Sequence, residues 1–239
     1  MNYNALLYAL AAILLGAVGI AFHDFAMQWQ NVPKAIPAMP WAYVSGAILV
    51  IGGALVFVRE KIGALVLASF YGLWVVAFHL PPTLMNAPGS IGAWNGPAEA
   101  AFVTAGGLAL FAAHSASRAK FALAARLLAG ASAAIFGFAH FNYIDFTASM
   151  VPAWIPAKTF WAWATGAGHL LTGIALLTGI RAKLAAACEA AMMGSFVVLL
   201  HLPRVIAAPY QHVEWIMLAM SSALTGAALL VRKYATIEA

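Results

Sequence analysis

The sequence predicts an all-α integral membrane protein of eight transmembrane helices, arranged as a tandem duplication of a four-helix bundle. Of its 239 residues, 64% are hydrophobic and only 8% are charged, whereas soluble domains carry about 25% charged residues. The apolar runs have the length of a membrane-spanning helix and lack the alternation of barrel strands. Several motifs also occur twice, once in each half of the chain.

Proline, glycine and charged residues divide the chain into eight apolar runs. Glycine and alanine are frequent within them, and such small residues allow helices to approach closely in a membrane. The single cysteine, Cys188, lies in the seventh run and has no partner for an intrachain disulfide. The predicted spans are Asn4–Gln28, Trp41–Val58, Ile62–Met85, Pro97–Ser117, Phe121–Phe146, Phe160–Ile180, Leu184–Ile206 and Val213–Val231.

Basic residues predict the orientation of these spans. Four clusters of arginine and lysine fall on one side of the membrane if the spans alternate in direction. The positive-inside rule then predicts a multi-pass protein of a bacterial-type inner membrane with both termini in the cytoplasm. The net charge of +5 is explained by this orientation and does not indicate nucleic-acid binding. The clusters are Arg59/Lys61, Arg118/Lys120, Arg181/Lys183 and Arg232/Lys233.

The connections on the opposite side, residues 31–37, 86–96, 150–157 and 207–211, are rich in proline and flanked by tryptophan. Tryptophan at the level of the lipid headgroups forms the aromatic belt of membrane proteins. The alternative interpretation is a lid of aromatic loops over a cavity that opens toward the periplasm.

The two halves share motifs, which predicts a first repeat over residues 1–118 and a second over residues 119–239. Four spans per half give parallel repeats, whereas inverted repeats are the usual mark of alternating-access transporters. This topology disfavours a transporter without excluding one. The recurring motifs are Val32-Pro33…Ile36-Pro37 with Val151-Pro152…Ile155-Pro156, Arg59-x-Lys61 with Arg181-x-Lys183, His79-Leu80-Pro81 with His201-Leu202-Pro203, and the glycines that precede His23 and His140.

The second half carries Val151-Pro152, then Gly166-Ala-Gly-His-Leu-Leu-Thr-Gly173 and Arg181-x-Lys183. In this pattern it resembles the DoxX-like family of four-helix membrane proteins, and the first half repeats the same frame. The resemblance implies a membrane bundle and, in some members, a subunit of a quinone-linked oxidoreductase such as thiosulfate:quinone oxidoreductase. The family commonly has glutamate where this chain has His169, and the first half has Leu49 there.

Ionisable side chains within a membrane are costly, so each is a candidate functional residue. Most of them fall near the non-cytoplasmic ends of the spans, and we expect them to line one cavity there. His169 lies deeper, about 13 Å into span six. Glu189 and Arg126, near the cytoplasmic boundary, are predicted to pair with each other. The candidate ligand-binding residues are His23, His79, His140, His201, His169, Asp145 and Glu214.

The histidines have three possible roles. His79 and His201 precede prolines that remove a helical donor, so one interpretation makes them structural residues that supply the missing hydrogen bond at a kink. As a pair at equal depth, related by a rotation about the membrane normal, they are also candidates to hold haem or a metal ion. The third role is binding of a quinone-like molecule, which needs proton-exchanging groups in an apolar slot. Asp145 or Glu214 would then orient one imidazole.

The sequence contains no G-x-S-x-G, H-E-x-x-H, phosphate-binding glycine loop or C-x-x-C. Enzymatic activity is therefore left open, at most that of a membrane subunit whose electron donor lies on another chain. We predict a DoxX-like membrane subunit that docks an oxidoreductase partner or binds a quinone-like ligand near the periplasmic face. The alternatives are a membrane scaffold or anchor without a ligand, and a transporter of small solutes or lipids. Besides lipids, the expected partner is the oxidoreductase chain, with no nucleic acid.

Overall fold

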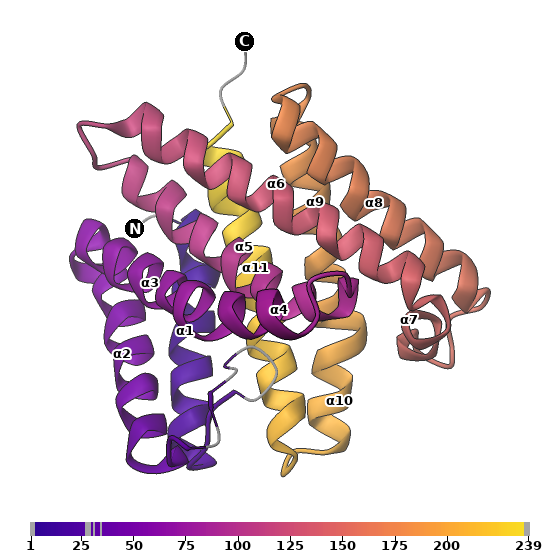
Figure 1. Ribbon diagram of the computed structural model, residues 1–239, viewed down its shortest axis with the longest axis horizontal. Helices are drawn as coiled ribbons and strands as arrows, with labels where there is room; N and C mark the ends of the chain where they lie inside the picture. Colours follow the sequence, from indigo (N-terminus) through magenta and orange to yellow (C-terminus); the bar gives the residue numbers. More distant parts are fainter. Residues whose placement is uncertain (1–2, 27–29, 31, 34, 237–239) are drawn as a thin grey trace.

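The computed structural model describes residues 3–26, 30, 32–33 and 35–236, and within these ranges the chain consists of helices and their connections (Figure 1). Seven helices in this part of the chain are long and apolar enough to cross a membrane. Helices satisfy every backbone hydrogen bond internally, which hydrocarbon surroundings require. The prediction of an α-helical, multi-pass membrane protein is confirmed.

Most helices coincide closely with a predicted span, but the helix Ile91–Ala112 begins and ends five to six residues before the predicted span Pro97–Ser117. Spans three and seven are each divided by a π-helical turn. Residues 27–29, which include the predicted end of the first span and Trp29, lie outside the described residues. In chain order the elements are α1 (Tyr3–Ala21), α2 (Ala38–Val58), α3 (Glu60–Leu73), η1 (Trp74–His79), α4 (Leu80–Asn86), α5 (Ile91–Ala112), α6 (Arg118–Asn142), α7 (Ile144–Met150), α8 (Lys158–Thr178), α9 (Ala182–Phe196), η2 (Val197–His201), α10 (Leu202–Ala207) and α11 (His212–Tyr234).

The first helix ends at Ala21, earlier than the sequence predicts. His23 adopts a left-handed backbone conformation with φ of 57°. A left-handed residue just after a helix allows the following backbone amides to donate hydrogen bonds to the last carbonyl oxygens of the helix. Here the Asp24 amide donates to Gly19 O at 3.2 Å. His23 therefore lies in the turn beyond α1 and not within the helix.

The two His-Leu-Pro motifs fold in the same way. Each histidine ends a π-helical turn, η1 at His79 and η2 at His201. The Leu80 amide donates to Val75 O and the Leu202 amide to Val197 O, one residue farther back than in an α-helix. Proline one position later lacks an N–H and crowds the preceding turn, and the wider π turn accommodates it. Such turns frequently occur at functional sites.

The helices of the first segment, residues 3–112, and of the second segment, residues 118–234, pack on one another in the same order. The last long helix of each segment also packs against the other segment. Within the first segment, α1 packs on α2, α2 on α3, and α3 on α5. Within the second, α6 packs on α8, α8 on α9, and α9 on α11. The last long helix of each segment also packs against the first helix of the other, α5 on α6 and α11 on α1, and α5 meets α11 at the centre.

Individual contacts recur between the segments at the start of these last helices. The Trp94 indole Nε1 donates to Pro88 O at 2.9 Å, and the Trp215 indole Nε1 donates to Pro209 O at 2.8 Å. Both tryptophans lie near the N-terminus of their helix, and each bond fixes the connection that leads into it. The connections before α5 and α11 are therefore held by equivalent bonds.

Glycine contacts recur as well. A methyl group on Gly72 would lie 3.5 Å from Thr104 Cγ2, and one on Gly194 would lie 3.5 Å from Thr225 Cγ2. Between the segments, a methyl group on Gly106 would lie 2.6 Å from the Ala227 Cβ. This approach of α5 to α11 needs a residue without a side chain.

The helix α5 is less apolar than the other long helices. It has 22 residues, yet it is not among the seven most apolar helices, because its first turns contain Asn95, Pro97 and Glu99. Its second half is almost entirely buried, from Ala100 to Ala112. In Figure 1 the connections α5–α6 and α8–α9 lie at the top with the C-terminus, whereas the start of α11 lies at the bottom.

Candidate functional site

A cavity of about 560 Å³ lies in the second segment, bounded by α6, α7, α8, α9, η2 and α11, with α5 closing one side. Its walls are mostly apolar and aromatic, which is the usual character of a small-molecule site. A few polar groups converge on it. The apolar walls include Phe136, Phe146, Trp161, Phe196, Met192 and Met193, and the polar lining includes His140, His169, His201, Asn95, Glu99 and Thr165.

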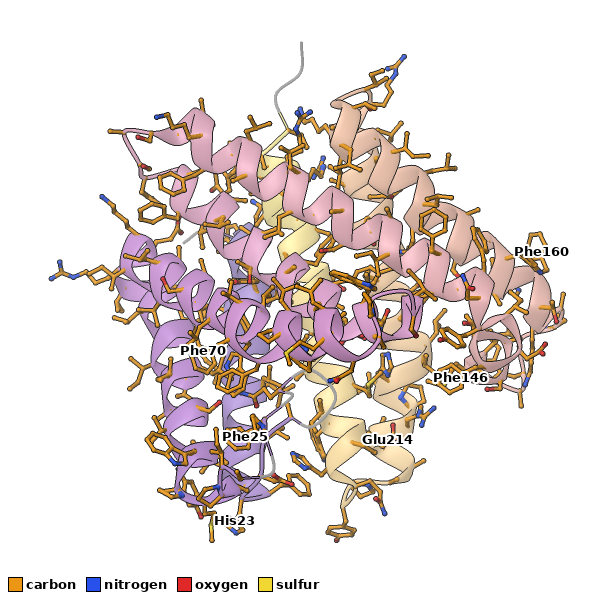
Figure 2. All side chains as sticks on the ribbon, in the orientation of Figure 1. His23, Phe25, Phe70, Phe146, Phe160 and Glu214 are labelled. Atoms are coloured by element: carbon orange, nitrogen blue, oxygen red, sulfur yellow. The ribbon has the colours of Figure 1, made fainter. Side chains whose placement is uncertain are left out.

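The connection that precedes α8 forms part of this lining. Val151, Pro152 and Ile155 of the Val-Pro-x-x-Ile-Pro motif border the cavity, together with Phe146 of α7. Trp154 in the same connection is largely exposed, at 69%. The motif thus contributes its aliphatic residues to the cavity and presents its tryptophan outward. Figure 2 shows Phe146 and Phe160 on the side of the molecule formed by α7 and α8.

His140 lies near the C-terminal end of α6 and faces the cavity. Its Nδ1 is 2.8 Å from Phe136 O. A carbonyl oxygen only accepts, so Nδ1 carries the proton of the neutral ring and Nε2 presents a lone pair. Within the described residues Nε2 has no hydrogen-bond partner. His140 therefore offers the cavity a hydrogen-bond acceptor.

His169 on α8 lies beside His140, with the ring centroids 4.8 Å apart. Its Nδ1 is 2.8 Å from Glu189 Oε1 on α9, and both side chains are buried, at 2% and 0% exposure. Glu189 Oε2 has no partner among the described residues. His169 lines the cavity whereas Glu189 lies behind it. The predicted pairing of Glu189 with Arg126 is wrong, because the two helices α8 and α9 place His169 nearer to this carboxylate.

His201 ends the turn η2 and also lines the cavity. Its Nδ1 is buried and has no partner within the described part of the chain. A buried polar atom without a partner is unfavourable, so this atom marks a place for a ligand group or a water molecule. His79, at the matching position of η1, is buried at 3% exposure but does not line this cavity.

The remaining predicted residues lie outside the cavity. Arg204 binds Glu214 with two hydrogen bonds of 2.8 Å, so Glu214 pairs with arginine and does not orient a histidine. Asp145 is exposed on α7 and is not in the lining. His23 Nδ1 lies 2.6 Å from the Tyr43 hydroxyl, and Figure 2 shows His23 at the bottom of the molecule.

The predicted correspondence of His23 with His140 also differs from the structure. A methyl group on Gly137 would lie 2.9 Å from Gly166 O, and Gly16 approaches Gly46 O in the same way. His140 follows Gly137 by three residues, so its counterpart after Gly16 is Gly19. The first segment therefore has no imidazole at this position.

The metal interpretation gains no support from the cluster geometry. In the ranges that the structure describes, no group of three or more histidine, cysteine, aspartate or glutamate residues is placed to hold a metal ion. The two candidates for haem or metal, His79 and His201, lie in different surroundings, since only His201 lines the cavity.

The sequence did not lead to the selection of Asn95, Glu99 and Thr165, which belong to the polar lining of the cavity. Asn95 and Glu99 come from α5 of the other segment, and the Asn95 amide donates to Glu99 Oε1 at 2.9 Å. Their spacing of four residues in the polar start of an apolar run is the signal that could have identified them. Glu189 was recognised as an intramembrane charge, but with the wrong partner.

Comparison of the chain with protein-family models, with curated proteins and with solved structures finds no match.

Proposed function

We propose that this protein binds a quinone-type molecule in the cavity of the second segment and serves as the membrane subunit of an oxidoreductase. The observation that carries the proposal is the convergence of His140, His169 and His201 on one apolar, aromatic cavity. A quinone ring needs flat apolar walls and, at its oxygens, groups that exchange protons. The resemblance to DoxX-like proteins supports the same class of ligand and a partner chain that exchanges electrons with it.

The protonation of His140 favours the reduced form of such a ligand. Because Nδ1–H is committed to Phe136 O, the neutral ring accepts a hydrogen bond at Nε2. A quinol hydroxyl donates, whereas a quinone carbonyl only accepts. The buried Nδ1 of His201 supplies a further polar contact. We therefore propose that the quinol is the form that enters the cavity.

The proposal extends to the membrane topology. The recurring contacts of the two segments support a tandem duplication of a four-span repeat, in which α5 is the fourth span and raises the number of spans from seven to eight. We further propose that the termini lie in the cytoplasm, on the side of Arg59/Lys61 and the other basic clusters. In a Cys188→Ala background, cysteines at the exposed positions Ser90 and Ser117 test this. An impermeant thiol reagent added outside intact cells should label position 90 only, and labelling of position 117 alone would reverse the orientation.

The ligand is tested by extracting the protein purified from membranes and by titrating it with a short-tailed ubiquinol. We expect bound quinone in the extract and saturable binding. His140→Ala and His201→Ala should each weaken binding roughly ten-fold, the usual effect of losing a buried hydrogen-bond partner. His23→Ala, outside the cavity, is the matched control. Unchanged affinity in both cavity variants would favour a scaffold.

A further inference from the structure

We propose that His169 and Glu189 form a proton-accepting pair, which takes a proton from a ligand hydroxyl in the cavity and stores it behind the cavity wall. The proposal rests on the proposed function, because it assigns a role to the same cavity. It adds Glu189, a residue that never reaches the ligand, as the final acceptor of the proton.

The geometry connects the cavity to a buried carboxylate through one ring. His169 lines the cavity, and its Nδ1 lies 2.8 Å from Glu189 Oε1. Within the described residues, that contact is the one hydrogen bond of the Glu189 carboxylate, and its second oxygen is buried without a partner. An imidazole is suited to such a relay because it accepts a proton at one nitrogen while it releases another from the opposite nitrogen.

The matching positions of the first segment show that packing does not require this pair. His169 follows Gly166 by three residues as Leu49 follows Gly46, and Glu189 precedes His201 by twelve as Leu67 precedes His79. Leu49 and Leu67 are buried at 1% and 0% exposure. These two buried positions are therefore leucines in one segment and an ionisable pair in the other.

The cost of burial supports a function for the polar version. Removing a histidine and a carboxylate from water is unfavourable, and apolar residues of similar volume often stabilise a protein more than a buried ion pair does. Chains of histidine and acidic residues within a membrane commonly carry protons. Glu189 lies at the end of such a chain, and His169 is its contact with the cavity.

The step is a transfer of one proton and moves no electrons. The ligand hydroxyl donates to His169 Nε2, its O–H bond breaks, and an Nε2–H bond forms. The Nδ1 proton passes to Glu189 Oε1, which becomes a carboxylic acid, while the ligand keeps the electron pair of its O–H bond. The number of charges in the bundle stays the same, so the transfer adds no new desolvation cost.

The test compares short-tailed ubiquinol, which carries the hydroxyls, with the corresponding ubiquinone, using the full-length protein in detergent. The wild-type protein should bind the quinol more tightly. Glu189→Gln keeps an acceptor for His169 Nδ1 but not the charge, and should lower quinol affinity about five-fold while quinone affinity is unchanged. His169→Leu/Glu189→Leu, which copies the first segment, should abolish the preference for quinol.

Infrared difference spectroscopy distinguishes proton transfer from hydrogen bonding alone. Quinol binding should produce the band of a protonated carboxyl group in the wild type, and Glu189→Gln should remove that band. A preference for quinol that survives in both variants, or the absence of the band, would overturn the proton-accepting role while the binding site stands. If neither probe binds the wild-type protein, the proposed function itself fails, and the role of the pair fails with it.

Discussion

The two segments solve the same packing problem with different residues. At two matching positions, α2 and α3 carry Leu49 and Leu67, whereas α8 and α9 carry His169 and Glu189, whose side chains are hydrogen-bonded to each other. All four residues are almost completely buried. The helices around these positions pack in the same order in both segments, and a π-helical turn ends at His79 in one and at His201 in the other. The difference teaches that two such buried positions can be filled by leucine, so burial alone does not explain the polar pair of the second segment.

The largest expected effect separates the two members of the polar pair. His169→Leu leaves the Glu189 carboxylate buried without a partner and should lower the free energy of unfolding by about 3–5 kcal/mol. The double variant His169→Leu/Glu189→Leu should recover the wild-type value or exceed it, as the first segment implies. Thermal unfolding in detergent, followed by circular dichroism, measures both.

The double variant also provides the control for this prediction. If it is as unstable as His169→Leu, the leucine pair does not fit between α8 and α9. The comparison between the segments would then fail, because their helix contacts would differ in shape as well as in polarity.

A smaller effect is expected where the segments meet. A methyl group on Gly106 would lie 2.6 Å from Ala227 Cβ and 2.7 Å from Ala227 Cα. Gly106→Ala should therefore lower the free energy of unfolding by about 1–3 kcal/mol, the usual cost of overpacking. Gly89→Ala is the control, since a methyl group there meets no atom within 4 Å. Equal stability of the two variants would show that α5 and α11 approach less closely.

The smallest effect tests the likeness of the segments directly. Gly72→Ala and Gly194→Ala each place a methyl group at an ordinary distance, 3.5 Å, from a threonine methyl group. Both are helical positions, so each substitution should stabilise the protein by roughly 0.4–1 kcal/mol. The comparison requires the two values to agree. Opposite signs, measured by the same unfolding assay, would show that the surroundings of η1 and η2 differ.

The helices were predictable from the sequence because each apolar run has the length that a membrane requires. The structure of residues near the ends of the helices was harder to predict. His23 was placed inside a span, yet its left-handed conformation ends α1 before it. Hydropathy cannot show such a turn, since His23 follows an apolar run and no glycine or proline marks the end of the helix.

The candidate site was predictable in part. Depth along the spans selected His140, His169 and His201, which do share one cavity. Depth could not tell which way a side chain faces around a helix, so it also selected Asp145, which is exposed. Glu99 reaches the cavity only because α5 crosses to α6, and that crossing depends on tertiary packing that no local pattern encodes.

That crossing has a consequence for how the chain assembles. Since α5 packs on α6 and α11 packs on α1, the final helix of each segment also contributes to the bundle of the other segment. The two segments are therefore intertwined, and the short connection 113–117 joins them. Cleavage of that connection should therefore give two fragments that remain bound together. Neither fragment would hold a finished cavity, because the wall that carries Glu99 belongs to its companion.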